Sequence, residues 1–353
     1  MRWDLVIVGG GPGGAAAAIT AKQADSSLRV LLIERSLFPR HCPGETLHPG
    51  IEPLLVQLGV WDQVLAADFL RHTGHWVAWN RPCEFQPFGM DEGGNLWQGF
   101  QAWRADFDQI LLERARDAGV AVWQPCRALH PLVKKLDQAG QAVVGVVCER
   151  DGKLHEILAQ YVVDAGGGTH WLARKLSLAI ENYSPKLIVN YGYANGKLST
   201  NHRLPLLMAD ERGWTWATHV KKDIYHWARL SLTNSHSEHR LPSALTGLTV
   251  QDKMYGADVT WRSVNHPAGP GYFISGDAGA VFDPTSSHGV LRAMMSGIYA
   301  GYLAVQVLRE KAQAGQATQI YTQWIQQWIQ HEVKNLHALY TMLPNPPDWV
   351  YKL

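Results

Sequence analysis

The sequence predicts an α/β fold in which a nucleotide-binding β-α-β unit is combined with an inserted β-sheet and a C-terminal helix. Three observations lead to it: a glycine-rich turn near residue 9, a second glycine-rich segment near residue 276, and strand-like segments between them. The 353 residues, 46% of them hydrophobic and 18% charged, have the balance of a globular protein. The formal net charge of +1 gives no electrostatic reason to expect binding of nucleic acid or of an anionic membrane.

The first element is a buried strand that runs into a glycine-rich turn. Residues 5–8 are all apolar, as in a buried parallel strand, and Gly9, Gly11 and Gly14 complete G-x-G-x-x-G before a helix over residues 15–22. The first glycine permits the tight turn, the second lets the backbone approach a pyrophosphate, and the third lets helix and strand pack closely. The start of the helix also presents free N–H groups to the anion.

The second strand is expected at Arg29–Ile33, and an acid follows it directly. Glu34 lies 20 residues after Gly14, which is the spacing at which a carboxylate accepts hydrogen bonds from a ribose hydroxyl. Strand, glycines, helix, strand and acid in this order predict a dinucleotide site, but they do not separate NAD from FAD.

Four later segments extend the same domain. Residues 104–119 favour a helix that begins with an arginine and ends at a glycine, and Tyr161–Gly168 favours a third strand. Tyr272–Asp277 favours a strand that ends in an acid, and residues 287–309 favour a long helix. Small residues in this last helix allow close approach to its neighbours, and its first N–H groups and its dipole would stabilise negative charge.

This order of motifs resembles the flavoprotein superfamily of p-hydroxybenzoate hydroxylase-like monooxygenases, which also contains tryptophan halogenases and geranylgeranyl reductases. The resemblance covers residues 1–65, 99–182 and 266–312. It implies that FAD is the cofactor, that Arg104 lies along the ribityl and pyrophosphate part of FAD, and that Asp277 holds the ribityl chain. Pro284-x-x-Ser-x-Gly289 matches the turn that brings a helix start to the pyrimidine edge of the flavin.

The resemblance also implies that a loop at residues 38–55 passes the pyrophosphate and the flavin, with Arg40 as a phosphate contact and Gly44 and Glu45 along the isoalloxazine ring. The family usually has an Asp-Gly pair after the third strand. Here the chain reads Asp164-Ala-Gly-Gly, and Asp164 is not expected to bind the cofactor. The residues expected to contact FAD are Gly9, Gly11, Pro12, Gly13, Gly14, Glu34, Arg35, Arg40, Gly44, Glu45, Arg104, Gly276, Asp277, Pro284, Ser287, His288, Gly289 and Val290.

The resemblance also divides the chain, and implies a Rossmann-like FAD-binding domain of glutathione reductase family topology. The FAD-binding domain is expected at residues 1–70, 99–182 and 266–312, an inserted substrate domain at 71–98 and 183–265, and a helical segment at 313–353. Residues 143–149 and 154–158, joined at Asp151-Gly152, favour a β-hairpin. A helix near residues 318–342 carries an apolar stripe, which core packing explains better than a docking face for a partner.

Three short motifs narrow the resemblance. Gly213-Trp-Thr-Trp216 resembles the GWxW segment of flavin-dependent halogenases, which also need a lysine on a strand of the substrate domain. The corresponding strand, residues 71–80, has His75 or Trp76 near that place and no lysine, which disfavours halogenation. Together with PGETLHPGIEPLL and DPTSSHGV, the pattern looks most like the flavoproteins that mature cysteine tryptophylquinone amine oxidases of the lysine ε-oxidase and glycine oxidase type.

The expected function is therefore that of an FAD-dependent monooxygenase that uses O₂ to oxygenate an aromatic substrate. The resemblance implies that this substrate is a tryptophan side chain of a precursor quinoprotein amine oxidase, which would be the protein partner. His48 and His288 are expected nearest the flavin and are the candidate catalytic residues. NAD(P)H, bound transiently, or another reductant would provide the electrons. Two alternatives stay open: a flavin oxidase or reductase that inserts no oxygen, and an assembly factor in which the flavin is structural.

Other expectations concern metals and location. No group of histidines, cysteines and acids has metal-ligand spacing, so no metal site is expected. The four cysteines form no CxxC pair, and neither a signal peptide nor a bilayer-spanning apolar stretch is visible. These observations favour a cytoplasmic protein with reduced thiols.

Overall fold

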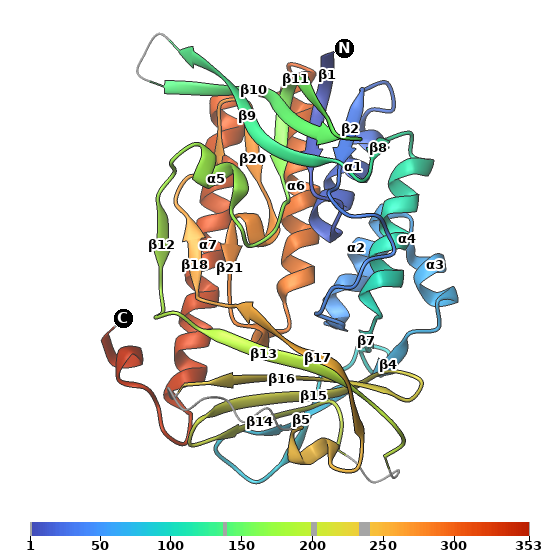
Figure 1. Cartoon of the computed structure of the whole chain (residues 1–353), viewed down its shortest axis with the longest axis vertical. Helices are drawn as coiled ribbons and strands as arrows, with labels where there is room; N and C mark the ends of the chain where they lie inside the picture. The colour runs from blue at the N-terminus through green and yellow to red at the C-terminus, as the bar shows by residue number, and fades with distance from the viewer. Residues whose placement is uncertain (1, 137–139, 199–202, 233–240, 353) are drawn as a thin grey trace.

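The computed structural model describes residues 2–136, 140–198, 203–232 and 241–352, which form two main sheets joined by long helices (Figure 1). The first sheet has the order β19-β20-β11-β1-β2-β8, and β10 and β9 branch from β11. From β20 to β8 neighbouring strands are parallel, which confirms the predicted α/β class. The strands are β1 (Arg2–Val8), β2 (Val30–Ile33), β8 (Ala121–Trp123), β9 (Arg127–Leu136), β10 (Gly140–Arg150), β11 (Lys153–Asp164), β19 (Ala268–Gly269) and β20 (Tyr272–Ile274).

Strand β11 combines two elements that the sequence suggested separately. Its first half pairs with β10 in the predicted hairpin, with Arg150 opposite Lys153. Its second half lies between β1 and β20, with Val162 beside both Val6 and Tyr272. No turn-forming residue interrupts the chain at residues 159–160, so one long strand serves both purposes.

Helices α1 and α6 pack side by side at unusually short range. A Cβ atom on Gly297 would lie 2.1 Å from the carbonyl oxygen of Gly13, and one on Gly301 would lie 2.4 Å from that of Ala17. This confirms the predicted use of small residues in α6. The helices are α1 (Pro12–Ala24), α2 (Glu52–Leu58), α3 (Trp61–Ala66), α4 (Arg104–Asp117), α5 (Trp171–Lys175), α6 (Gly289–Leu308) and α7 (Ala314–Thr341).

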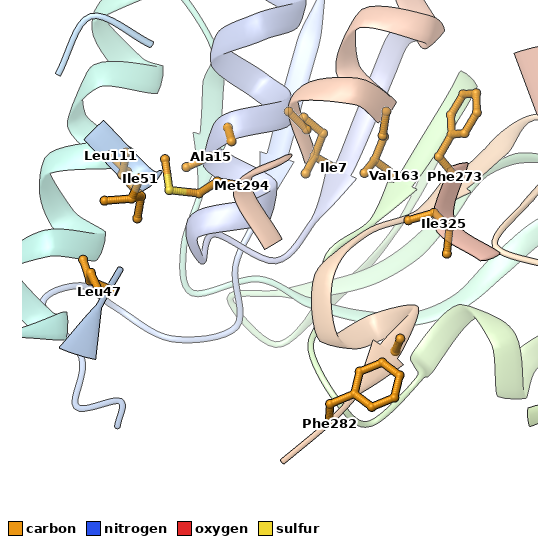
Figure 2. Packing of buried hydrophobic residues seen from close by; sticks show 14 of the residues in the cluster. Ile7, Ala15, Leu47, Ile51, Leu111, Val163, Phe273, Phe282, Met294 and Ile325 are labelled. Carbon is orange, nitrogen blue, oxygen red and sulfur yellow. The ribbon is translucent and has the colours of Figure 1, made fainter. Parts of the chain in front are cut away.

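The hydrophobic core surrounds this contact (Figure 2). Met294 of α6 and Ala15 of α1 are completely buried, as are Ile7 of β1 and Leu111 of α4. Within the described residues α6 is the one helix that is long and apolar enough to cross a membrane, but half of that stretch is buried inside the protein. Its apolar composition is therefore explained by packing against α1.

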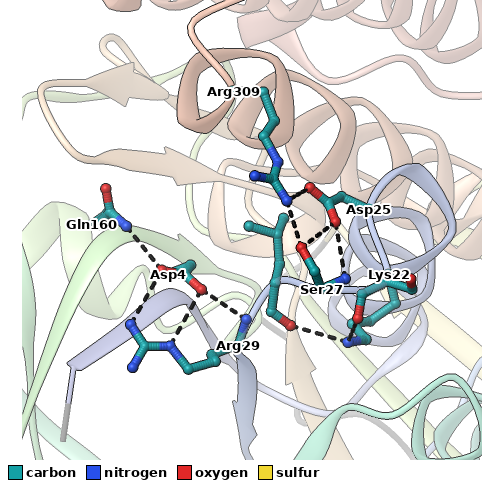
Figure 3. A network of polar contacts seen from close by, with 9 residues as sticks. Asp4, Lys22, Asp25, Ser27, Arg29, Gln160 and Arg309 are labelled. Carbon is teal, nitrogen blue, oxygen red and sulfur yellow. Dashed lines mark hydrogen bonds and ion pairs between the residues drawn. The ribbon is translucent and has the colours of Figure 1, made fainter.

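A polar network ties the far ends of α1 and α6 together (Figure 3). Arg309, which follows α6, contacts the side chains of Asp25 and Ser27 after α1. Nearby, Asp4 of β1 accepts hydrogen bonds from the backbone N–H of Arg29 at 2.8 Å and from the side chain of Gln160 at 2.9 Å. These contacts help to fix β1 between β2 and β11.

The second main sheet has the order β17-β13-β16-β15-β14-β5-β6, and every neighbouring pair is antiparallel except β14 with β5. Its strands come from within the two segments expected to form the substrate domain. They are β5 (Gly74–Ala78), β6 (Glu84–Pro87), β13 (Ile188–Asn195), β14 (Leu206–Asp210), β15 (Gly213–Lys221), β16 (Ile224–Ser231) and β17 (Thr249–Asp258).

The strand expected at residues 71–80 is divided between two sheets. β4 (Leu70–His72) pairs with β7 (Gly99–Gln101), which also pairs with β3 (Thr46–Leu47), whereas β5 joins the second main sheet. A Cβ atom on Gly74 would lie 2.3 Å from the carbonyl oxygen of Gln86, so β6 can approach this closely only at a glycine. A further small sheet contains β12 (Ile180–Asn182), β18 (Arg262–Val264) and β21 (Ala280–Val281).

Helix α7 runs along the molecule beside both main sheets (Figure 1). The hydroxyl of Tyr321 donates to the carbonyl oxygen of Ile274 in β20 at 2.9 Å. The indole N–H of Trp79, just after β5, donates to the carbonyl oxygen of Leu339 at 2.9 Å. The apolar stripe of α7 lies in or against the core, which confirms the core-packing interpretation.

Candidate functional site

The glycine-rich turn between β1 and α1 has the expected shape. Gly9 has a φ angle of +103°, a conformation that favours glycine. A Cβ atom on Gly14 would lie 1.9 Å from the carbonyl oxygen of Gly9, so the helix can begin this close to the strand only because residue 14 has no side chain. These two glycines therefore build the turn itself.

Gly11 and Pro12 open the start of α1 to a ligand. Gly11 is the residue before the helix and has an ordinary φ of −69°. The nearest atom to a Cβ there would be Nη2 of Arg40, at 3.4 Å. Pro12 has no N–H, and the N–H groups of Gly13 and Gly14 have no acceptor one turn earlier in the helix. The turn thus offers backbone donors beside a guanidinium, as a pyrophosphate requires.

Glu34 and Arg40 are the charged groups of this turn. The buried carboxylate of Glu34 accepts hydrogen bonds from the N–H groups of Gly10 at 2.7 Å and Ser36 at 2.8 Å. In the described part of the chain, Nε of Arg40 is buried and has no hydrogen-bond partner. Arg35, in contrast, is exposed. Arg40 is therefore the better placed of the two arginines to bind an anion at Gly11.

Asp108, which the sequence reasoning missed, holds two arginines in place. Its completely buried carboxylate accepts hydrogen bonds from Arg104 at 2.8 and 3.0 Å and lies 3.4 Å from Nη2 of Arg40. Arg104 also donates to the carbonyl oxygen of Pro43 at 3.0 Å. The i, i+4 spacing of Arg104 and Asp108 on one helix was the signal that could have identified the pair.

Gly44 and Glu45 lie between the residues expected to bind FAD and the second sheet. Gly44 has a φ angle of +101°, and a Cβ atom there would lie 3.2 Å from Nη1 of Arg104. Glu45 is only 1% exposed; its carboxylate accepts hydrogen bonds from the N–H of Gly44 and the hydroxyl of Tyr193 and lies 3.8 Å from Nδ1 of His226. The carboxylate of Glu45 is thus bound to β13 and β16.

Asp277 lies in a short 3-10 turn, Gly276–Ala278, rather than at the end of the preceding strand. Ser296 of α6 fixes this turn by accepting a hydrogen bond from the N–H of Gly276 at 2.9 Å. Asp277 has no hydrogen-bond or ion-pair partner among the described residues, and desolvation raises the pKa of its carboxyl group against the opposing charges of Arg292 and Arg104. A free acceptor at this place suits the hydroxyl groups of a ribityl chain.

Together these residues fit FAD. The open start of α1 and Arg40 would bind the pyrophosphate, Asp277 would bind the ribityl chain, and the start of α6, at Gly289 and Val290, would face the flavin. Asp164, which was not expected at the cofactor, accepts hydrogen bonds from the N–H groups of Gly166 and Leu172, both at 2.9 Å. Its carboxylate therefore stabilises the start of α5.

The turn before α6, residues 283–288, is held by a chain of buried hydrogen bonds. The carboxylate of Asp283 accepts from the N–H of Thr285 at 2.9 Å and from the hydroxyl of Tyr340 in α7. The Tyr340 hydroxyl in turn accepts from the indole N–H of Trp214 at 3.0 Å. Asp283, Trp214 and Tyr340 are all completely buried. The first tryptophan of the GWTW motif therefore has a structural contact, while the second, Trp216, lies at the pocket described next.

A pocket of about 210 Å³ lies between this turn and the second sheet. It brings together the candidate catalytic residues His48 and His288, whose rings are 5.2 Å apart. Pro284, expected at the cofactor, precedes the lining residues directly, and Ser287 has a φ of +52° at the end of the 3-10 turn. The lining residues are Thr46, Leu47, His48, His72, His75, Phe88, Trp216, Thr285, Ser286, Ser287 and His288.

The environment of the pocket keeps three of its imidazoles neutral. Burial lowers the pKa of His48, His72 and His75, and neighbouring positive groups add to the effect at His48 and His72. Among the described residues, no three histidine, cysteine or acidic side chains are placed to hold a metal ion. The pocket therefore presents neutral imidazoles and aromatic rings.

Acid is expected to destabilise the protein through His72. Burial, together with the charges of His75, Arg71 and His48, lowers the pKa of His72 to about 4. Because the unfolded chain binds this proton more readily than the folded one, stability is complete above about pH 6.5 and is lost as the pH falls towards 4, by about 2–3 kcal/mol. Urea unfolding of the His72→Gln variant at pH 7 and pH 5 should show a smaller loss than wild type. The exposed His130→Gln variant is the control, and an unchanged loss in His72→Gln would contradict the assignment.

The sequence matches the family model described as "FAD binding domain" over residues 2–323. It is 25% identical to a tryptophan 2-halogenase of Chondromyces crocatus, covering 90% of this chain and 64% of that protein. It is 27% identical to a 1H-pyrrole-2-carbonyl-[peptidyl-carrier protein] brominase of Pseudoalteromonas luteoviolacea, covering 84% of this chain and 76% of that one. The chain thus spans 64–76% of the length of these two relatives.

Comparison with solved structures establishes the fold. The myxobacterial chondrochloren halogenase CndH superposes with a TM-score of 0.87 at 22% identity, covering 98% of this chain and 84% of that one. A geranylgeranyl bacteriochlorophyll reductase-like protein of Thermoplasma acidophilum superposes with a TM-score of 0.78 at 21% identity, covering 99% of this chain and 90% of that one. With the family model spanning most of the sequence, the chain belongs to the FAD-binding domain family.

Proposed function

We propose that this protein is a halogenase-like FAD-dependent oxidoreductase that uses O₂ to oxygenate an electron-rich aromatic substrate. The observation that carries the proposal is the pocket that lies between the 283–288 turn and the second sheet. Its volume of about 210 Å³ exceeds the roughly 150 Å³ that suffices to hold a benzene ring. When bound, reduced FAD supplies the electrons for the activation of O₂.

The residues of the pocket suit an aromatic substrate in three ways. Phe88 and Trp216 provide aromatic walls, which favour offset or edge contacts with another ring and exclude water. The imidazoles of His48 and His75 are kept neutral by burial, so they can form hydrogen bonds without placing charge in the pocket. The segment Thr46–His48 brings the pocket next to Glu45 and the FAD-binding residues.

Halogenation is the second candidate, and the relatives favour it, because the two named above are a tryptophan halogenase and a pyrrole brominase. The similarity to these halogenases opposes the sequence argument, which disfavoured halogenation because residues 71–80 contain no lysine. The pocket itself favours direct oxygen transfer, since His75 of β5 lines it and no lysine is among its described lining residues.

We further propose that the substrate is a tryptophan side chain of a precursor protein that acquires cysteine tryptophylquinone. This proposal is supported by the position of three motifs that are far apart in the sequence but contribute residues to the same pocket. His48 of PGETLHPGIEPLL, Trp216 of GWTW and His288 of DPTSSHGV all line the one pocket.

One experiment separates these possibilities. The FAD-loaded protein is reduced and exposed to isotopically labelled O₂, with and without bromide, in the presence of either a tryptophan-bearing precursor protein or free tryptophan, and the products are analysed by mass spectrometry. Labelled oxygen in the precursor supports the proposal. A brominated product that requires bromide replaces it with halogenation, and release of hydrogen peroxide with both substrates unchanged contradicts both.

A further inference from the structure

The neutral rings of His48 and His288 are expected to carry their proton on different nitrogens. Nδ1 of His48 accepts a hydrogen bond from the backbone N–H of Gly50 at 3.0 Å. A nitrogen that accepts carries no hydrogen, so the neutral ring of His48 has its proton on Nε2. His48 therefore offers a donor through its remaining nitrogen.

The ring of His288 is oriented by a carboxylate. Nδ1 of His288 lies 3.9 Å from Oε2 of Glu332, a buried residue of α7. A carboxylate at this nitrogen favours a proton on Nδ1 and leaves the lone pair of Nε2 free to accept one. His288 lines the pocket, and 39% of its side chain is exposed.

Glu332 is kept ionised by an arginine that is itself fixed. Nη1 of Arg292 lies 3.2 Å from Oε1 of Glu332. Burial opposes ionisation, but the contact with His288 and the charge of Arg292 lower the pKa of Glu332. The guanidinium of Arg292 lies over the rings of Phe282 and Trp328, at 5.3 and 4.6 Å. The carboxylate facing His288 is therefore negative and well positioned.

The place of His288 in the fold makes this carboxylate necessary. His288 is the residue before α6, where the partial positive charge of the helix start disfavours an imidazolium. His48, with His75 beyond it, faces the same ring, and a positive charge on either would add to the repulsion. Glu332 is the negative group near Nδ1 of His288, and its charge opposes the effect of these positive groups.

We propose that His288 is the proton acceptor of the pocket, that Glu332 is its positioning residue, and that His48 is the matching hydrogen-bond donor. This proposal rests on the proposed oxygenation. As the new C–O bond forms at the aromatic carbon, the C–H bond at that carbon breaks, its electron pair returns to the ring, and the proton passes to Nε2 of His288. Reduced FAD provides two electrons, and the second oxygen atom of O₂ leaves as water with protons from solvent.

The first test uses the flavin-free protein labelled with nitrogen-15 in its histidines. NMR should show the proton of His48 on Nε2 and that of His288 on Nδ1 at neutral pH, with His48→Phe and His288→Asn used for assignment. Glu332→Gln should lower the titration midpoint of His288 by about one pH unit or more, a tenfold change in proton affinity. Glu310→Gln, at an exposed position after α6, is the matched control and should leave it unchanged.

Two outcomes of this test overturn the proposal: the same tautomer on both rings of the wild type, or a His288 titration that ignores Glu332→Gln. The tautomers are read in the wild type, so a variant that fails to fold does not remove the test.

The second test measures the rate of product formation against pH. At saturating FAD, His288→Asn should reduce the rate by about 10²–10⁴-fold, as expected for loss of a general base. Glu332→Gln should move the acidic limb of the profile to lower pH. A His288→Asn variant with a wild-type rate overturns the proposal. If the tautomers are as stated but the wild type forms no product, the proposed function is contradicted and the tautomer assignment stands.

Discussion

Gly14→Ala is expected to prevent stable folding. The added Cβ atom would lie 1.9 Å from the carbonyl oxygen of Gly9 and 3.3 Å from the Cβ of Ala165, and the first contact is with backbone that cannot rotate away. Relief requires α1 to move from β1, which would also disturb its contact with Gly297 of α6. We expect a loss of more than about 4 kcal/mol, a size that single substitutions reach only when such a specific clash exists. Soluble yield and urea unfolding measure it.

The matched control is Gly315→Ala in the first turn of α7. Nothing lies within 4 Å of a Cβ atom at that position, and alanine is the better helix former. This variant should unfold at the same or a slightly higher urea concentration than wild type. If Gly14→Ala unfolds within about 1 kcal/mol of the control, the close packing of turn and helix has been misjudged.

Gly11→Val is expected to leave the fold intact and to remove most of the affinity for FAD. The φ angle of −69° is accessible to valine, and the one atom near its Cβ is the end of the flexible Arg40 side chain. The side chain would, however, occupy the place where the pyrophosphate approaches the start of α1. We expect about a hundredfold weaker binding, or roughly 2.7 kcal/mol. Quenching of FAD fluorescence on titration into the flavin-free protein gives the affinity.

This prediction has its own control in stability. Urea unfolding without FAD should give the same midpoint for Gly11→Val and wild type, whereas Gly14→Ala should not fold stably. Equal FAD affinities for wild type and Gly11→Val would show that the cofactor does not lie at this turn, and would remove the main support for a flavin enzyme.

The nucleotide-binding half of the fold was predictable because its residues act locally. The position of each glycine in the G-x-G-x-x-G motif indicates which close contact it permits. The buried strands are recognisable because they are continuous apolar runs. The long helix α6 was predictable for the same reason, since its small residues directly permit the approach of α1.

The second sheet was less accessible to sequence reasoning. The predicted strand at residues 71–80 changes sheets at Gly74, where the limiting contact is with Gln86 of another strand. Such a contact depends on which backbone lies opposite, and no local pattern contains that information. Likewise, Glu45 was expected along the isoalloxazine ring, and no local pattern indicated that its carboxylate accepts a hydrogen bond from Tyr193, nearly 150 residues later in the chain.

Glu332 is the most instructive omission from the candidate site. The buried residues of α7 follow helical spacing, and Glu332 occupies one of these buried positions. The others include Tyr321, Ile325, Ile329, Leu336 and Tyr340. A glutamate at a position that helical spacing reserves for an apolar side chain signals a buried partner. The sequence could therefore reveal that Glu332 was unusual, but its partners Arg292 and His288 follow only from the packing of α7 against α6.

The attachment of the 283–288 turn to α7 has a consequence for biosynthesis. Tyr340, which binds Asp283, is one of the last residues of α7 to leave the ribosome, long after the glycine-rich turn has emerged. A nascent chain can therefore assemble the adenosine end of the cofactor site early, but it cannot complete the flavin end until translation of this helix is finished. Complete assembly of the expected cofactor site is therefore possible only once α7 has been synthesised.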